Sequence, residues 1–191
     1  INQTSTRDVD GNKLTANYNE GIAYNYKSIS GYTSDPDRNQ LLFMKQMGYA
    51  IGGDVMNVVN TSVLGADSIL GVKYVLSSYD IPGLKKLENI EPGNGKYVYE
   101  NSYALPMAFT YMESSEPLPD MSESNAFLYQ NQVYSYLLGR DVEVNKEIVC
   151  EPQPEANKVV YNIENRNDPL YGYFEMKDDK SGKIFWGDQF I

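Results

Sequence analysis

Apolar residues recur at helical spacing in two stretches of the chain. The first is SDPDRNQLLFMKQMGY (34–49), where Leu41, Met44 and Met47 share one face and Gly48 follows them. A Ser-Asp pair precedes Pro36, so a polar side chain can cap the N-terminus while proline occupies the first turn. Glycine after the last apolar position is typical of a helix end. This stretch therefore predicts an amphipathic helix.

The second helical stretch is SESNAFLYQNQVYSYLLGRD (122–141). Ser122 or Ser124 can cap it, and Gly139 is placed to end it. Helical spacing puts four residues on one stripe, with Val133 and Leu137 beside it: Phe127, Asn131, Tyr134 and Leu138.

Alternating apolar and polar residues predict strands before residue 118. The segment GIAYNYKSIS (21–30) alternates so that Tyr24 and Tyr26 fall on one aromatic face of a strand. The rest of this part predicts, in order, a short helix over 62–70, a strand over 71–78, a hairpin over 84–102 and a strand over 103–112.

The last third of the chain has a β pattern. Short alternating runs separated by turn residues occupy 142–152, 157–165, 169–178 and 182–190. We therefore expect an α+β protein: an N-terminal α/β subdomain over 1–118, then a helix and a β-sandwich-like part over 119–191. The sandwich would be incomplete if the native sheet continues past Ile191, and its exposed edges would then promote association.

Composition narrows the functional classes. The 191 residues carry a net charge of −10, which argues against a nucleic-acid surface and against charge-driven binding to an anionic membrane. No apolar run is long enough to span a bilayer, and the abrupt ends suggest an excised domain. The 17 tyrosines have two interpretations: a surface that stacks on sugars or proteins, or the ordinary composition of half-buried sheets.

The residues offer little chemistry. Without any histidine, the common nucleophile systems and the commonest zinc ligand are missing, and the single Cys150 is best interpreted as a small buried residue. Asp8, Asp10 and Asn12 have the alternate spacing of calcium ligands, but the segment departs from the EF-hand pattern and is better interpreted as a solvated turn. We predict no catalytic residue, no metal and no cofactor.

The candidate binding residues come from two aromatic strands. Glu100 lies in YVYENSYALP, at a strand end where polar side chains can position a ligand or order a turn, and it is the best single acidic candidate for glycoside chemistry. The candidates are Tyr24, Tyr26, Tyr99, Glu100 and Asn101.

Three segments together resemble a known family. ADSILGVKYVLSS (66–78), YVYENSYALPMAF (97–109) and NAFLYQNQVYSYLLGRD (125–141) occur in the order and at the spacing found in the YfhO family of bacterial multi-pass membrane proteins. GIAYNYKSIS (21–30) also looks like a family segment. The resemblance covers most of 20–145. Within it, Gly71 would permit a tight turn from helix to strand, so the Leu-Gly-Val-Lys-Tyr motif is best interpreted as structural.

The resemblance implies an activity for the whole protein. Such proteins look like GT-C-type glycosyltransferases that glycosylate teichoic acids from a polyprenyl-phosphate sugar, with a large region outside the cytoplasmic membrane. This chain would be that extracytoplasmic portion. The family's acidic catalytic residue lies in an early loop between membrane helices and has no counterpart here, so the isolated chain should have no turnover.

Two other functions stay open. The first is a non-catalytic module that binds carbohydrate or protein through its tyrosines. The second is a glycoside hydrolase, which would need two carboxyl groups about 5–10 Å apart in a cleft. Hydrophobic membrane spans flanking the chain would favour the glycosyltransferase over both.

Overall fold

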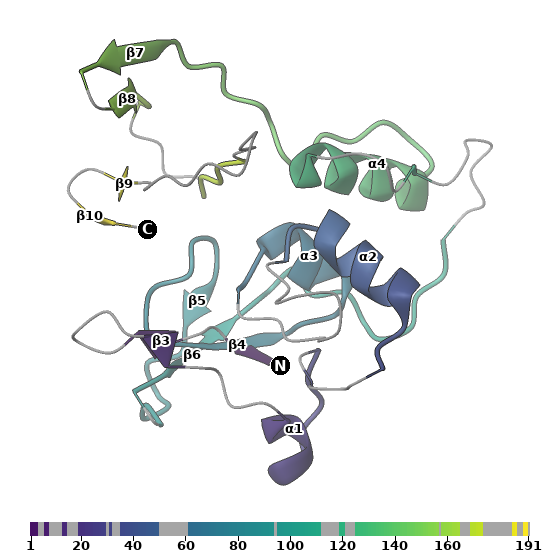
Figure 1. Ribbon diagram of the computed structural model, residues 1–191. Coiled ribbons are helices and arrows are strands. Elements are labelled where there is room, and N and C mark those ends of the chain that lie inside the picture. The colour runs from purple at the N-terminus through teal and green to yellow at the C-terminus, as the bar shows by residue number, and fades with distance from the viewer. Residues whose placement is uncertain are drawn as a thin grey trace.

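The computed structural model describes residues 1–3, 6–7, 13–14, 19–29, 31, 35–49, 61–93, 95–111, 119–120, 125–156, 158–164, 169–173, 185–186 and 189–190. The helices are α1 (Glu20–Ala23), α2 (Arg38–Gln46), α3 (Leu64–Ile69) and α4 (Ala126–Leu138). The strands are β1 (Asn2–Gln3), β2 (Thr6–Arg7), β3 (Lys13–Leu14), β4 (Tyr74–Ser77), β5 (Lys85–Lys86), β6 (Tyr97–Glu100), β7 (Pro152–Glu155), β8 (Lys158–Tyr161), β9 (Phe185–Trp186) and β10 (Gln189–Phe190). Helices and mostly antiparallel strands together make an α+β protein, as the sequence predicts (Figure 1).

A four-stranded sheet forms the base of the N-terminal part. Its strand order is β1-β4-β6-β5, with β1 parallel to β4 and the other neighbours antiparallel. The hairpin predicted over 84–102 is confirmed as β5 and β6. Gly93 and Lys96 bridge across its turn, and Gly95 has a φ of 71°, a conformation that glycine adopts without strain.

The strand predicted over 71–78 is confirmed as β4, which follows α3 after a single tight turn. Gly71 makes this turn with a φ of 66°, as the motif suggests. Along β4, Val75 and Ser77 are buried while Tyr74 and Leu76 are partly exposed. The strand therefore directs its alternate residues to two differently buried faces of the sheet.

The helix predicted from 34–49 is confirmed as α2. The predicted cap, Ser34 or Asp35, is wrong because the helix begins only at Arg38. Asp37 caps it and accepts a 2.8 Å hydrogen bond at Oδ1 from the backbone N–H of Gln40. Met44 and Met47 are buried as the pattern predicts, and Gly48, with a φ of 95°, ends the helix.

The second predicted helix is confirmed as α4, but its buried face differs from the predicted stripe. Asn125 caps it, not the predicted Ser122 or Ser124, because the helix begins at Ala126, and Gly139 ends it in the left-handed conformation. Its buried residues are Ala126, Tyr129, Gln130 and Val133. Gln130 is fully buried because its amide N–H donates to the carbonyl of Met47 at 2.9 Å, a polar contact that an apolar pattern cannot reveal.

Two apolar clusters hold the N-terminal part together. The first joins α2, α3 and α4 and contains Met44, Met47, Tyr49, Val63, Ala66, Tyr129 and Val133. The second packs on the sheet and contains Val72, Val75, Ile81 and Tyr99. Figure 1 shows α2 and α3 above the sheet, with α4 above both helices.

Four predicted strands are wrong within the described residues. Residues 21–29 form α1 and a return loop, because Asn19 and Asn25 take positive φ values that an extended strand does not allow. Residues 103–111 carry no strand and begin with a turn, in which Ala104 N–H bonds to the carbonyl of Asn101 at 3.4 Å. Residues 142–151 and 169–173, which belong to two further predicted runs, also carry no strand.

The C-terminal part contains short antiparallel hairpins. Strands β7 and β8 pair over four residues each, and β9 pairs with β10. Figure 1 shows β7 and β8 well apart from the four-stranded sheet. The sandwich-like arrangement stays a prediction, and the predicted boundary at 118 lies outside the residues described.

Candidate functional site

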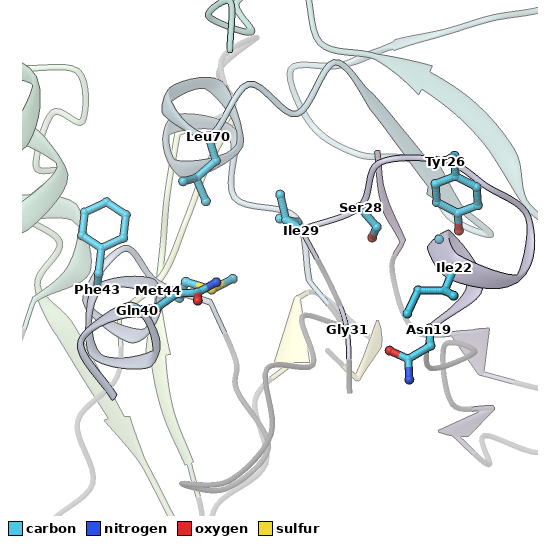
Figure 2. Close-up of a pocket in the computed structure, with 11 residues that line it drawn as sticks. Asn19, Ile22, Tyr26, Ser28, Ile29, Gly31, Gln40, Phe43, Met44 and Leu70 are labelled. Carbon is cyan, nitrogen blue, oxygen red and sulfur yellow. The ribbon is translucent and has the colours of Figure 1, made fainter. Parts of the chain in front are cut away.

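A cavity of about 550 Å³ opens between α1, the loop that follows it, and α2. Figure 2 shows Gln40, Phe43 and Met44 of α2 on one side and Asn19, Ile22 and Tyr26 on the other, with Ile29 between them. The lining is Asn19, Gly21, Ile22, Tyr26, Ser28, Ile29, Gly31, Gln40, Phe43, Met44 and Leu70.

The return loop after α1 shapes one wall of this cavity. Asn25 reverses the chain with a φ of 55°, and the N–H of Tyr26 donates to the carbonyl of Gly21 at 2.9 Å. A Cβ on Gly21 would lie 2.9 Å from the carbonyl oxygen of Tyr26 and 3.1 Å from Cβ of Ser28. Glycine at 21 therefore allows the close approach that brings Tyr26 and Ser28 to the cavity.

The lining combines apolar surface with uncharged polar groups. Ile22, Ile29, Phe43, Met44 and Leu70 supply the apolar part, and Asn19, Tyr26, Ser28 and Gln40 the polar part. None of the described lining residues is charged. Such a surface suits a neutral ligand with both an apolar face and hydroxyl groups.

The five candidate binding residues do not form one site. Tyr26 lines the cavity, whereas Tyr24 is 72% exposed and does not line it. The other three, Tyr99, Glu100 and Asn101, lie at the end of β6. Their role in binding stays a prediction, and the geometry of each shows what it contacts within the protein.

Asn101 links the end of β6 to the turn between α3 and β4. Its side-chain amide is buried and donates to Ser68 Oγ at 3.2 Å and to the carbonyl of Val72 at 3.1 Å. Its Oδ1 accepts a 3.0 Å bond from the N–H of Tyr103. These bonds hold the connection between two neighbouring strands.

Glu100 and Tyr99 point to opposite faces of β6. Glu100 Oε1 lies 3.8 Å from Lys73 Nζ in a partly exposed ion pair, a weak interaction. Tyr99 is buried, and its hydroxyl donates to Asp80 Oδ1 at 2.8 Å. Burial, together with this hydrogen bond, raises the pKa of Tyr99 from 10.0 to about 12.

This pKa shift predicts a change in stability at alkaline pH. In the unfolded chain Tyr99 ionises near its ordinary pKa of 10.0, while the folded protein keeps the proton until about 12. The folded state then binds more protons than the unfolded state, so Tyr99 makes stability fall as pH rises between these values. Denaturant titrations at several pH values between these two pKa values measure the free energy of unfolding. Tyr99→Phe should make its slope against pH shallower, by up to the contribution of about one bound proton. Equal slopes in the two proteins would contradict it.

A second buried cluster surrounds Asp67 in α3, and no local sequence pattern indicates it. The side chain is 0% exposed. Its Oδ1 accepts a 2.6 Å hydrogen bond from the Tyr49 hydroxyl, and its Oδ2 accepts one from Ser62. Burial and the Asp67 carboxylate raise the pKa of Tyr49 far above its usual range. The sequence predicted a short helix over 62–70, but nothing local paired Asp67 with a tyrosine 18 positions earlier.

Neither a membrane span nor a metal cluster occurs in the part of the chain that the structure describes. None of its helices is both long and apolar enough to cross a bilayer. The cysteine and acidic side chains of this part form no group of three or more that could hold a metal ion. The segment with calcium-like spacing at Asp8, Asp10 and Asn12 lies outside the described residues.

Comparison with known proteins identifies the family. The chain has no significant match among curated proteins or solved structures. The family model described as "Bacterial membrane protein YfhO" matches residues 2–184, nearly the whole chain. The chain therefore belongs to the YfhO family of bacterial membrane proteins.

Proposed function

We propose that this chain is the extracytoplasmic portion of a membrane glycosyltransferase that glycosylates cell-envelope polymers such as teichoic acid. In this proposal, the cavity between α1 and α2 receives a sugar unit of the acceptor polymer. Membership of a membrane-protein family supports the location at the membrane. The observation that carries the binding role is the uncharged, partly apolar lining around Tyr26.

The lining fits a sugar ring in size and chemistry. A volume of about 550 Å³ exceeds that of one monosaccharide and lies within the usual range for small-molecule sites. Phe43 and Ile29 offer apolar surface to the C–H faces of a sugar, and the Tyr26 ring can do the same. The side chains of Asn19 and Gln40 carry both donors and acceptors, which suit hydroxyl groups.

Charge explains why a sugar, rather than a phosphate, would be recognised in the cavity. The chain carries a net charge of −10 and repels polyphosphate at long range. Lys27 is exposed directly after Tyr26, with its Nζ 3.5 Å from Met107 Sδ. In a bound polymer, the phosphate next to the sugar would lie near Lys27, while the neutral ring occupies the lining.

The transfer reaction itself would take place elsewhere in the parent protein. The polyprenyl-phosphate sugar is a lipid and would be held by the membrane-embedded part, which would also carry the catalytic acid. The present chain would position the acceptor. On its own it should bind the polymer without transferring sugar.

Binding experiments on the purified chain can test this role. Tyr26→Ala should weaken binding of a glycosylated teichoic-acid fragment by about tenfold, equivalent to about 1.4 kcal/mol. Tyr24→Ala is the matched control, because Tyr24 lies two residues away but does not line the cavity. Its affinity should stay within about twofold of the original chain, a change of about 0.4 kcal/mol. Titration followed by NMR measures both.

Two results would count against the cavity as the sugar site. Equal losses for the two variants would place recognition on the exposed tyrosines rather than in the cavity. Unchanged binding for both would remove the tyrosines from recognition altogether.

A protein-binding module is the second candidate, and one surface feature favours it. The segment 103–111 is mostly exposed and carries four exposed large apolar or aromatic side chains: Tyr103, Met107, Phe109 and Tyr111. Aromatic residues and methionine are enriched in protein interfaces. Binding of a protein through this segment, without any affinity for polymer, would support this second function.

A further inference from the structure

The hairpin of β7 and β8 is exposed on both of its faces. All four residues of β7 are exposed, and in β8 only Val160 is partly buried. Val159 and Tyr161 are 55% and 52% exposed. A two-stranded hairpin without a third strand or a helix against it is marginally stable in water. The hairpin therefore exposes surface that another strand can cover, and pairing with that strand would stabilise it.

One edge of this hairpin cannot accept a strand. In the register of the pair, Pro152 faces Tyr161, Gln153 faces Val160, Pro154 faces Val159 and Glu155 faces Lys158. In an antiparallel pair, alternate residues direct their N–H and C=O groups inward and outward. Proline has no N–H, so Pro152 and Pro154 fit only the outward-facing positions. The outer edge of β7 therefore lacks donors at both positions and is blocked.

The outer edge of β8 is open by the same reasoning. Val159 and Tyr161 lie opposite the two prolines, so their N–H and C=O groups also point outward, away from β7. Both residues can donate and accept. In the described residues, no backbone hydrogen bond outside the hairpin involves either of them. The hairpin thus presents a single competent edge, along Lys158–Tyr161.

We propose that this edge pairs with the same edge of a second copy of the chain, in antiparallel orientation, with the two-fold axis at Val160. In this register Val159 of one copy and Tyr161 of the other exchange backbone hydrogen bonds, and the symmetry repeats the exchange. The result is one four-stranded sheet of order β7-β8-β8-β7, which satisfies the need for more strands.

The side chains are complementary in this register. Val159 faces Tyr161 of the second copy, a pairing of a β-branched with an aromatic residue that stabilises sheets. Lys158 faces Asn162 and lies diagonal to Glu164 of the second copy, so opposite charges approach and the two lysines stay apart. The β8 edges of two copies are therefore complementary in backbone hydrogen bonding, in side-chain packing and in charge. This inference does not depend on the proposed sugar site.

Disulfide trapping tests the predicted axis. In an antiparallel pair without mutual hydrogen bonds, as at the Val160 pair, Cα atoms are about 4.5 Å apart, within the range of a disulfide. In a Cys150→Ser background, Val160→Cys should oxidise to a covalent dimer. Val149→Cys is the control, because Val149 is 83% exposed and lies outside any strand. Equal cross-linking of the two variants, or none for Val160→Cys, would overturn the proposal.

Sedimentation velocity tests the open edge without any cross-link. The chain should show a monomer–dimer equilibrium, and Val159→Pro should shift it to monomer because it removes one outward donor while leaving the hairpin's own hydrogen bonds in place. Val149→Pro, the same substitution away from the edge, should behave like the original chain. A monomer at every accessible concentration, or a dimer that Val159→Pro leaves intact, would overturn the proposal. Pairing with a strand of a different protein would appear as the first of these results.

Discussion

Replacing Asp67 with alanine is expected to lower the free energy of unfolding by about 3–5 kcal/mol. The fully buried carboxylate accepts hydrogen bonds from the hydroxyls of Tyr49 and Ser62. A hydrogen bond to a charged group contributes about 1.5–3 kcal/mol, and its loss also leaves the buried donor without its acceptor. The substitution removes both bonds at the junction of α3 with the segment that follows α2. Denaturant unfolding followed by circular dichroism measures the loss.

A control and a conservative variant make this result specific. Asp141→Ala removes an exposed carboxylate after α4 and should change stability by less than about 0.5 kcal/mol. Asp67→Asn keeps the shape and one acceptor, so it should fall between the two. A loss for Asp67→Ala no larger than that for Asp141→Ala would show that the cluster does not stabilise the fold.

Gly71→Ala should destabilise the protein by about 2–4 kcal/mol, for two reasons that can be separated. A side chain in the left-handed conformation costs about 1–2 kcal/mol, and Gly71 has a φ of 66°. In addition, the new Cβ would lie 2.9 Å from the carbonyl oxygen of Leu105, which is backbone and cannot move alone. The segment after β6 would have to shift, at a further cost typical of overpacking.

Gly139→Ala isolates the first of these costs. Gly139 has nearly the same φ, 62°, but a Cβ there would meet nothing within 4 Å. Gly139→Ala should lower the free energy of unfolding by about 1–2 kcal/mol. This decrease is smaller than that for Gly71→Ala by the cost of the close contact. The same unfolding assay compares the two. Equal losses would show that the strand–turn packing around Gly71 is loose.

Local sequence patterns predicted an element correctly where all the information lay within that element. The helix over 38–46 was predictable because its apolar spacing and Gly48 agreed, although its cap, Asp37, was not the residue expected. The β5–β6 hairpin was predictable because Pro92-Gly93-Asn94-Gly95 separates two alternating runs. The Gly71 turn followed from its place between a helical and a strand pattern.

Patterns failed where tertiary contacts decided the outcome. The alternation of Tyr24 and Tyr26 predicted a strand, but the two asparagines at 19 and 25 reverse the chain around α1. The face of α4 was misjudged because Gln130 is buried by a hydrogen bond to the end of α2. In both cases the structure was determined by individual polar residues, and the spacing of apolar residues did not predict it.

The candidate site was predictable only in part. Tyr26 was chosen for its aromatic character, and it does line the cavity. The opposite wall comes from α2, whose residues Gln40 and Phe43 appeared in the sequence only as part of a helix pattern. A cavity between two elements depends on how they pack, and a single sequence read segment by segment does not contain that information.

The most direct test of the proposed function is the sugar content of teichoic acid in cells. A strain lacking the full-length protein would be complemented with the original gene, with Tyr26→Ala or with Tyr24→Ala, at matched protein levels. The proposal predicts full glycosylation with the original gene and with Tyr24→Ala, and a clear reduction with Tyr26→Ala. Unchanged sugar content in the strain without the protein would contradict a role in envelope glycosylation and leave a binding module as the function.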